Sequence, residues 1–265
     1  MHRDIAEVLA RYSWWHTIDL DGGLVTPGVW DIRHLAPRIP WPEALQGKRC
    51  LDVGTMDGFW AFEMEKRGAG EILAIDVPYS VSDVHPQRRP TLAQRSHRQV
   101  GETFNALVDL LHSKAAFQTL NIYDLNPDAI GMFDLVFVGY LLHQLRDPLR
   151  VLEAVRSVCR GSVIVLDPIL YFRSLLSRQP SATIGARRDY DDYFYFNAAG
   201  LERVVELAGF RVAAVSPFLY YHRGPAVKLS DLSLATILQY SIGRAACSLA
   251  VRGDVNGLLD LDTIT

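Results

Sequence analysis

Short apolar runs alternate with amphipathic segments over most of this chain. Runs rich in valine, isoleucine and leucine predict strands, and apolar residues spaced three or four apart predict the helices between them. Strands that alternate with helices form βαβ crossovers, which build a parallel sheet with helices on both faces. The expected strands are 49–53, 71–76, 116–121, 133–138 and 161–167, and the expected helices are 58–67, 97–113, 147–158 and 198–208.

Two further β-like runs, 210–217 and 219–228, follow the last of these helices. They are split near Pro217, and we expect them to pair antiparallel at one edge of the sheet. An apolar run near 231–250 has helical spacing. Such a helix could pack on the domain, cover the site or join two subunits into a homodimer.

The first part of the chain has a different character. Residues 3–15 predict an amphipathic helix, and the aromatic and turn residues after it predict a lid or a hairpin. We therefore expect residues 1–46 to form an N-terminal helix and aromatic lid, 47–228 the main α/β domain, and 229–265 a C-terminal helical extension.

Two long insertions interrupt the α/β pattern. The segment 78–100 is broken by prolines and carries the basic residues Arg88, Arg89, Arg95 and Arg98, and the segment 168–196 mixes aromatic residues with acids and arginines. Loops of this length inside a domain are usually functional or disordered, and the aromatic content of the second argues against disorder. Both are expected to act as lid elements.

Composition narrows the class of protein. The chain has 265 residues, is 49% hydrophobic and carries a net charge of −3, which is typical of a globular protein and argues against a broad nucleic-acid face. Three distant cysteines show no disulfide or metal spacing, so no metal is predicted. With neither a secretory leader nor a membrane-spanning apolar run, the chain is expected to be cytoplasmic, without a membrane partner.

Residues 50–76 carry the strongest chemical signal: a strand, a glycine turn, a helix, and a second strand that ends on an acid. Gly54 allows a sharp turn close to a ligand, and Gly58 opens the helix without a Cβ in the way. A dinucleotide site uses G-x-G-x-x-G and places a pyrophosphate on the helix N-terminus. The motif here is D-V-G-T-M-D-G, and its acids would repel a pyrophosphate but suit the cationic S-adenosylmethionine.

Two later segments complete the predicted cofactor site. Asp76 ends the second strand and could accept both ribose hydroxyls. Ile122 or Tyr123 could pack on an adenine ring, and Asp124 could accept its amino group. The full set of predicted cofactor contacts is Asp52, Gly54, Thr55, Asp57, Gly58, Phe59, Asp76, Val77, Ile122, Tyr123, Asp124 and Gly139.

The block Leu51–Gly58, with Asp76, Tyr123-Asp124 and Phe133-Asp134-Leu135-Val136, resembles the class I S-adenosylmethionine-dependent methyltransferases over about residues 45–217. The resemblance implies a Rossmann-like, seven-stranded, mostly parallel sheet. Met56 and Asp57 depart from the family, because they replace a common small-residue and glycine pair. The stretch is closer to a subgroup similar to the tRNA wobble-uridine carboxymethyltransferases and to bacterial natural-product methyltransferases.

Ligands of open α/β sheets bind at the carboxyl ends of the strands. Tyr140, His143 and Arg146 follow the strand at 133–138 and are therefore expected on this rim. His143 is the first candidate for a general base, since its ordinary pKa suits proton removal at neutral pH. The alternative is that it only hydrogen-bonds its own loop or flanks the cofactor. His16 and Tyr140 are the next candidates, and His222 with Tyr220 and Tyr221 are weaker ones.

The leading hypothesis is a methyltransferase that acts on a small molecule of secondary or sugar metabolism, O-directed, by in-line SN2 transfer. The alternatives are a tRNA wobble-uridine enzyme and a non-catalytic cofactor-binding protein; nucleic acid is disfavoured by the net charge, and Leu142 stands where the carboxymethyl-transferring relatives have a carboxylate-recognising tyrosine. Asp134 and Asp167 could approach each other at strand ends and bind a cation. The expected substrate contacts are Trp14, Trp15, Trp30, Arg146, Tyr193 and Tyr195.

Overall fold

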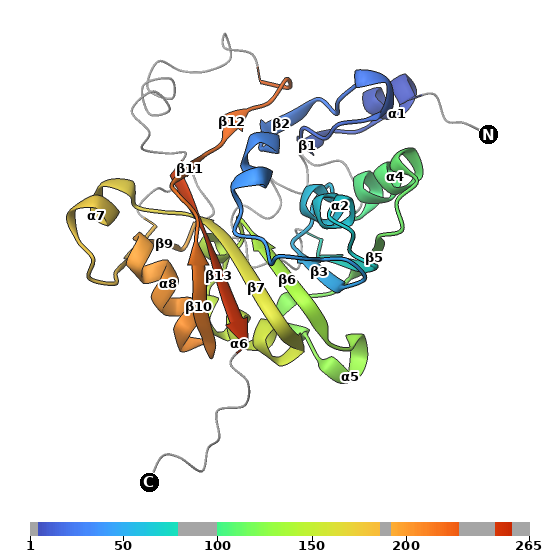
Figure 1. Cartoon of the computed structure of the whole chain (residues 1–265). Coiled ribbons are helices and arrows are strands. Elements are labelled where there is room, and N and C mark those ends of the chain that lie inside the picture. The colour runs from blue at the N-terminus through green and yellow to red at the C-terminus, as the bar shows by residue number, and fades with distance from the viewer. Residues whose placement is uncertain (1–4, 79–99, 186–191, 228–246, 256–265) are drawn as a thin grey trace.

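The computed structural model describes residues 5–78, 100–185, 192–227 and 247–255. Its centre is one large sheet with helices on both faces (Figure 1). The strands follow the order β10-β13-β7-β6-β3-β4-β5, and β11 is attached to β13. Within this path β13 runs antiparallel to both of its neighbours, and the strands from β7 to β5 pair in parallel. The predicted α/β fold with a seven-strand, mostly parallel path is confirmed.

The central strands are nearly continuous apolar runs because helices cover both of their faces. The strands are β3 (Arg49–Val53), β4 (Glu71–Asp76), β5 (Ala116–Thr119), β6 (Phe133–Gly139), β7 (Cys159–Pro168), β10 (Phe210–Val215), β11 (Leu219–Tyr220) and β13 (Cys247–Val255). The helices between them are α2 (Phe59–Lys66), α4 (Glu102–Leu111), α5 (Pro127–Ile130), α6 (Pro148–Val158) and α8 (Ala198–Leu207).

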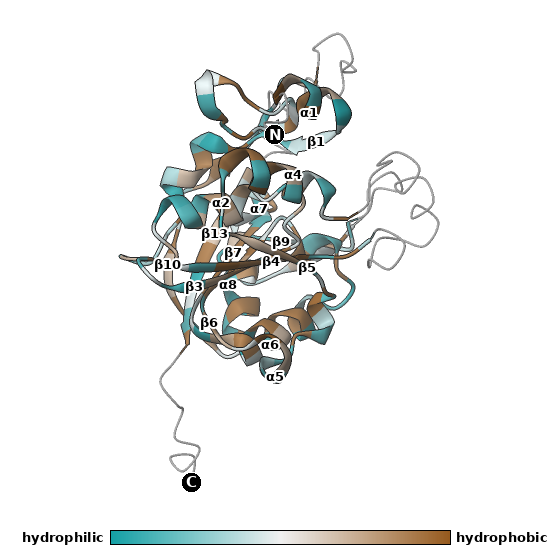
Figure 2. Cartoon of the chain, turned by 90° about the vertical axis from the view of Figure 1, so that its right-hand side faces the viewer, coloured by the Kyte–Doolittle hydropathy of each residue, from teal (hydrophilic) through white to brown (hydrophobic). Residues whose placement is uncertain are grey.

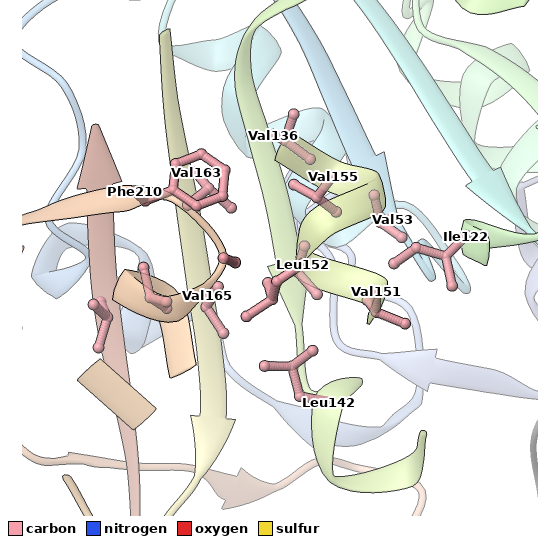
Figure 3. Close-up of a cluster of buried hydrophobic side chains, with 14 of the residues drawn as sticks. Val53, Ile122, Val136, Leu142, Val151, Leu152, Val155, Val163, Val165 and Phe210 are labelled. Atoms are coloured by element: carbon pink, nitrogen blue, oxygen red, sulfur yellow. The ribbon is translucent and has the colours of Figure 1, made fainter. Parts of the chain in front are cut away.

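Figure 2 shows the sheet nearly edge-on, with α2 and α4 on one face and α5 and α6 on the other. Helix α6 shows how the local sequence builds this arrangement. Asp147 caps it by accepting a hydrogen bond from the Arg150 backbone N–H at 3.1 Å, and Pro148 occupies its first turn. Its apolar stripe, which includes Val151 and Val155, packs against Val136 of the sheet in the buried cluster of Figure 3.

The N-terminal part forms a small separate sheet. This part of the chain contains α1 (Ile5–Arg11), β1 (Trp14–His16), β2 (Gly28–Asp31) and the 3-10 turns η1 (Asp21–Gly23) and η2 (Arg33–Arg38). Strand β1 pairs in parallel with β2, and β12 (His222–Arg223) pairs antiparallel on the other side of β2. The helix expected over 3–15 therefore ends at Arg11, because the following residues alternate between buried and exposed at the period of a strand.

Two expectations for the C-terminal part are wrong. Runs 210–217 and 219–228 do not pair with each other: β10 and β11 both pair with β13, and β12 joins β2. The helix expected near 231–250 is wrong for 247–250, which belong to β13, so the main sheet continues past the expected boundary at 228. A fully buried strand and a buried helix segment look alike by periodicity. Residues 228–246 lie outside the described residues.

The second insertion contains α7 (Tyr171–Leu176) and a hairpin of β8 (Ala182–Ile184) and β9 (Phe194–Phe196). The basic positions of the first insertion, Arg88, Arg89, Arg95 and Arg98, lie outside the described residues, and the helix expected at 97–113 begins at Glu102. No helix in the described ranges combines the length and the apolar character that crossing a membrane requires.

Candidate functional site

The carboxyl ends of the parallel strands meet along one edge of the sheet. The strand register sets Val53 of β3 beside Ile75 of β4 and Val138 of β6, and sets Gly139 of β6 beside Leu166 of β7. The loops after these strands therefore form one continuous rim, on which most of the predicted site residues lie.

The loop after β3 is held in shape by Asp52. Its Oδ2 accepts hydrogen bonds from the Thr55 hydroxyl at 2.6 Å and from the Ala61 backbone N–H at 3.2 Å. Gly54 and Gly58 both have positive φ, +71° and +92°, and a Cβ on Gly58 would lie 2.7 Å from the rings of Phe104 and Phe62. The two glycines are required by this backbone path, as expected from the motif.

Burial raises the pKa of Asp52 from 3.8 to about 7, against the hydrogen bonds from Thr55 and Ala61. The pKa of Asp52 is higher in the folded protein than in the unfolded chain. Between these two pKa values the folded protein therefore binds more protons, and the stability that this binding provides is lost as the pH rises through about 7. We expect the unfolding free energy of the wild type, relative to Asp52→Asn, to fall between pH 3.8 and about 7. Urea unfolding of both proteins across that range measures the difference; a constant difference would contradict it.

Asp57 joins this loop to two other elements. Its side chain is fully buried and accepts hydrogen bonds from the backbone N–H groups of Trp15 and His16, the second at 2.9 Å. Its other oxygen accepts from the Thr103 hydroxyl of α4 at 2.7 Å. The Nδ1 atom of His16 lies 4.0 Å from the carboxylate. The residue that departs from the family's glycine therefore ties the N-terminal sheet to the predicted cofactor loop.

Asp76 reaches back from the end of β4 to the same loop. Its Oδ2 accepts from the Met56 backbone N–H at 2.9 Å, and its Oδ1 accepts from the Val77 backbone N–H at 2.7 Å. Met56 adopts a left-handed φ of +51°, a conformation that glycine would adopt more readily. These two hydrogen bonds occupy one acceptor position on each carboxylate oxygen.

The third predicted segment lies in the 3-10 turn η3 (Ile122–Asp124). Ile122 is buried in the core, Tyr123 is half-buried, and Asp124 is exposed. The Tyr123 hydroxyl accepts a hydrogen bond from the Asp147 backbone N–H at 3.3 Å, which links this turn to the segment that follows β6.

His143 and Asp167 form a buried pair at the ends of β6 and β7. His143 lies in the 3-10 turn η4 (Leu142–Gln144), and its Nδ1 is 3.0 Å from Asp167 Oδ1. The His143 backbone N–H donates to the other carboxylate oxygen at 3.1 Å. Asp167 thus fixes both the ring and its backbone. This arrangement keeps the proton on Nδ1 and leaves Nε2 as the proton-accepting nitrogen of the neutral ring.

Burial lowers the pKa of His143, but the carboxylates of Asp167 and Asp192 outweigh burial, and the pKa lies above the ordinary 6.5. A carboxylate beside an imidazole stabilises its protonated form. His143 is therefore a stronger base than an unperturbed histidine. It loses the second proton of its imidazolium ring at a higher pH than an ordinary histidine does.

Tyr140 occupies the turn between β6 and η4. It adopts a left-handed φ of +54°, and its backbone N–H donates to Leu166 O at 2.6 Å. Burial raises the pKa of its hydroxyl well above the ordinary value of 10, with Ser248 opposing the shift, so Tyr140 stays neutral. Gly139 before it is tightly packed, since a Cβ there would lie 2.9 Å from Trp60 Nε1.

The predicted substrate residues divide into core and rim. Trp14 is only 3% exposed and belongs to the hydrophobic core, whereas Trp15 is 40% exposed. Phe59, which was predicted as a cofactor contact, is also only 3% exposed and lies in the same core. Trp30 is half-buried, with the Arg223 guanidinium 3.9 Å from its ring centre.

On the opposite side, the segment after β6 contacts the second insertion. The exposed Arg146 donates from Nε to the Tyr193 hydroxyl at 3.0 Å. The Tyr195 ring stacks against His143, with ring centres 6.3 Å apart. The weaker candidate His222 is exposed and stacks on His34.

The expected approach of Asp134 to Asp167 is wrong. Asp134 opens β6 and pairs with Arg160 at 2.9 Å, whereas Asp167 lies near the carboxyl end of β7. The described part of the chain contains no group of three metal-ligating side chains. The pairing of Asp167 with His143 was missed, although an acid at the carboxyl end of a neighbouring strand was a usable signal. Asp192, which faces His143 Nε2, had no such signal.

The fold and the rim are those of a Rossmann-like α/β protein, a class whose ligands bind along the carboxyl ends of the strands. A family model described as "Methyltransferase domain" matches residues 31–215, and the chain belongs to this family. The family predicted from the sequence, the S-adenosylmethionine-dependent methyltransferases, is confirmed.

The individual relatives of this chain share only a small part of its sequence. The tRNA U34 carboxymethyltransferase of Campylobacter hominis is 28% identical over 124 residues, which are 46% of this chain and 36% of that protein. The crystal structure of the N-terminal domain of EvdMO1, in the presence of SAH and D-fucose, has a TM-score of 0.58 at 14% identity and covers 96% of this chain and 98% of that one. Magnesium protoporphyrin IX methyltransferase (ChlM) from Synechocystis PCC 6803, with bound SAH, has a TM-score of 0.50 at 14% identity, with 80% and 76% covered. At these identities the structural likeness concerns the fold.

Proposed function

We propose that the protein transfers a methyl group from S-adenosylmethionine to a hydroxyl oxygen of a small molecule of secondary or sugar metabolism, with His143 as the general base. The observation that carries this proposal is the buried pair of His143 and Asp167, with 3.0 Å between Nδ1 and Oδ1, at the rim where such enzymes bind their ligands. A neutral hydroxyl is a weak nucleophile, and a positioned base increases its reactivity.

The donor supplies the methyl group, whose bond to sulfur breaks as its bond to the acceptor oxygen forms. Nε2 of His143 takes the hydroxyl proton during this attack. Asp167 accepts the hydrogen bond from Nδ1–H and stabilises the imidazolium that results. Tyr140, Trp15, Arg146 and Tyr193 are the candidates for walls that orient the acceptor.

For the donor, we assign the ribose hydroxyls to Asp76 and the amino-acid part to the loop from Asp52 to Gly58. The hydrogen bonds that Asp76 accepts from the Met56 and Val77 backbone N–H groups support this assignment, because they hold the carboxylate beside that loop. We assign the adenine ring to Tyr123 and Asp124. Ile122 is buried, so it supports these residues from beneath and offers little surface to the ring.

Leu142 favours transfer of a methyl group over transfer of a carboxymethyl group. In the carboxymethyl-transferring relatives this position is a carboxylate-recognising tyrosine, but here the side chain is fully buried in the core (Figure 3). It therefore contributes no polar group to the rim. A small acceptor is favoured over tRNA by the net charge of −3, because the chain lacks the excess of basic residues that phosphate contacts require.

Calorimetry tests the donor assignment. We expect S-adenosylmethionine and its demethylated product to bind one site and NAD not to bind. Asp76→Ala removes charged hydrogen bonds to the ribose and should weaken binding about tenfold or more, whereas exposed Asp128→Ala should leave it unchanged. Absence of binding by both adenosyl compounds would refute the proposal. Salt-dependent binding of tRNA, with methylation of it, would instead support the tRNA alternative.

A further inference from the structure

The hairpin of the second insertion is attached directly to the segment that carries His143. Strand β8 pairs with β9, and the Tyr193 backbone N–H donates to His143 O at 2.7 Å. The Leu170 backbone N–H donates to Phe196 O at 2.8 Å, which attaches the other end of β9 to the chain after β7. Asp192 lies two residues before β9 and next to Tyr193, so its position is tied to that of His143.

Asp192 faces the side of the imidazole that Asp167 does not reach. Its Oδ1 lies 3.5 Å from His143 Nε2, and its side chain is only 11% exposed. Its other oxygen accepts a hydrogen bond from the Tyr195 hydroxyl, while the Tyr195 ring stacks on His143. Among the described residues, the carboxyl groups within 4.0 Å of the ring nitrogens are those of Asp167 from β7 and Asp192 from the hairpin.

Each protonation state of His143 has its own partner at Nε2. An unprotonated Nε2 can accept from the Gln144 side-chain amide, whose nitrogen is 3.2 Å away, and a protonated Nε2 can donate to Asp192. A docked Asp192 therefore favours the imidazolium, which cannot take a further proton. An acceptor hydroxyl that approaches Nε2 must enter the place that Asp192 faces.

We propose that Asp192 is a positioning residue for the base: the hairpin holds the Nε2 side of His143, and the acceptor hydroxyl must enter between this nitrogen and Asp192 before the ring can act. The role of the ring as a base rests on the proposed function. The contact between Asp192 and His143 can be tested without an acceptor.

NMR titration of the histidine rings in the full chain tests the contact, with the His143 signals assigned from their loss in His143→Asn. Asp192→Asn keeps the size of the side chain and removes its charge. We expect the titration midpoint of His143 to move to lower pH in this variant, as it should in Asp167→Asn. Asp128→Asn removes the same charge from the exposed surface of α5 and should leave the midpoint unchanged.

Equal midpoints in Asp192→Asn and Asp128→Asn would overturn the proposal, as would a midpoint that moves upward. A circular dichroism spectrum and an affinity for S-adenosylmethionine equal to those of the wild type show that Asp192→Asn is folded. If the wild type binds no S-adenosylmethionine while the midpoint still moves, the proposed function fails and the contact stands. With an acceptor in hand, the acid limb of the rate profile should move to lower pH in Asp192→Asn.

Discussion

Replacing His143 with alanine is expected to lower the rate of methyl transfer by about 100- to 10,000-fold, which is the range for removal of a positioned general base. The donor affinity should stay within about twofold, because the side chain contacts Asp167, Asp192 and Gln144 rather than the loop after β3. Single-turnover transfer of labelled methyl to an identified acceptor, together with calorimetry of the donor, separates the two effects.

The matched control is His112→Asn, an exposed histidine at the end of α4 with a left-handed φ of +49° that asparagine tolerates. It should leave both quantities unchanged. Equal losses of rate and of donor affinity in His143→Ala would show that the residue supports binding and is not the base.

The rate of methyl transfer should also rise with pH. His143 acts only without its ring proton, and its carboxylate neighbours raise its pKa above 6.5 despite burial. The acid limb of the profile should therefore lie above this value, and activity should increase as the pH rises through it.

Asp57→Ala is expected to destabilise the protein by about 3–5 kcal/mol, a large part of the total stability of a typical domain. The carboxylate is fully buried and accepts from Trp15, His16 and Thr103. Its removal leaves three donors without their acceptor in a site closed to water. Urea unfolding measures the loss, and hydrogen exchange should show faster exchange at the Trp15 and His16 amides.

Two comparisons make the result specific. Asp57→Asn keeps one acceptor oxygen and should lose less stability than Asp57→Ala. Exposed Asp128→Ala should change stability by no more than about 0.5 kcal/mol. A loss from Asp57→Ala no larger than that of Asp128→Ala would show that water replaces the carboxylate without cost, contrary to its full burial.

Features that depend on neighbouring residues were predictable. The parallel strands β3, β4 and β6 are short apolar runs, and α6 combines a cap, a proline at its first turn and an apolar stripe. Gly54 and Gly58 predicted a turn, and both residues have positive φ. The choice of methyltransferase over dehydrogenase followed from the charges in the same short motif.

Features that depend on distant partners were not predictable in this way. The first residues of β13, 247–250, were mistaken for part of a helix, because the place of this strand between β7 and β10 buries it on both sides and removes the alternation of a half-exposed strand. Trp14 was expected in a lid, but the packing of α1 and β1 buries it in the core, where its ring N–H donates to Leu9 O.

By itself, the sequence determined the fold class, the glycine loop, the acid at Asp76 and the rim on which His143 lies, since periodicity and turn chemistry are local properties. Only the tertiary structure decided which side chains meet. Asp167 is 24 positions from His143 and Asp57 is 42 positions from Trp15, and no local pattern encodes either contact. Such pairs depend on strand register and on helix and hairpin packing, which arise when the whole core forms.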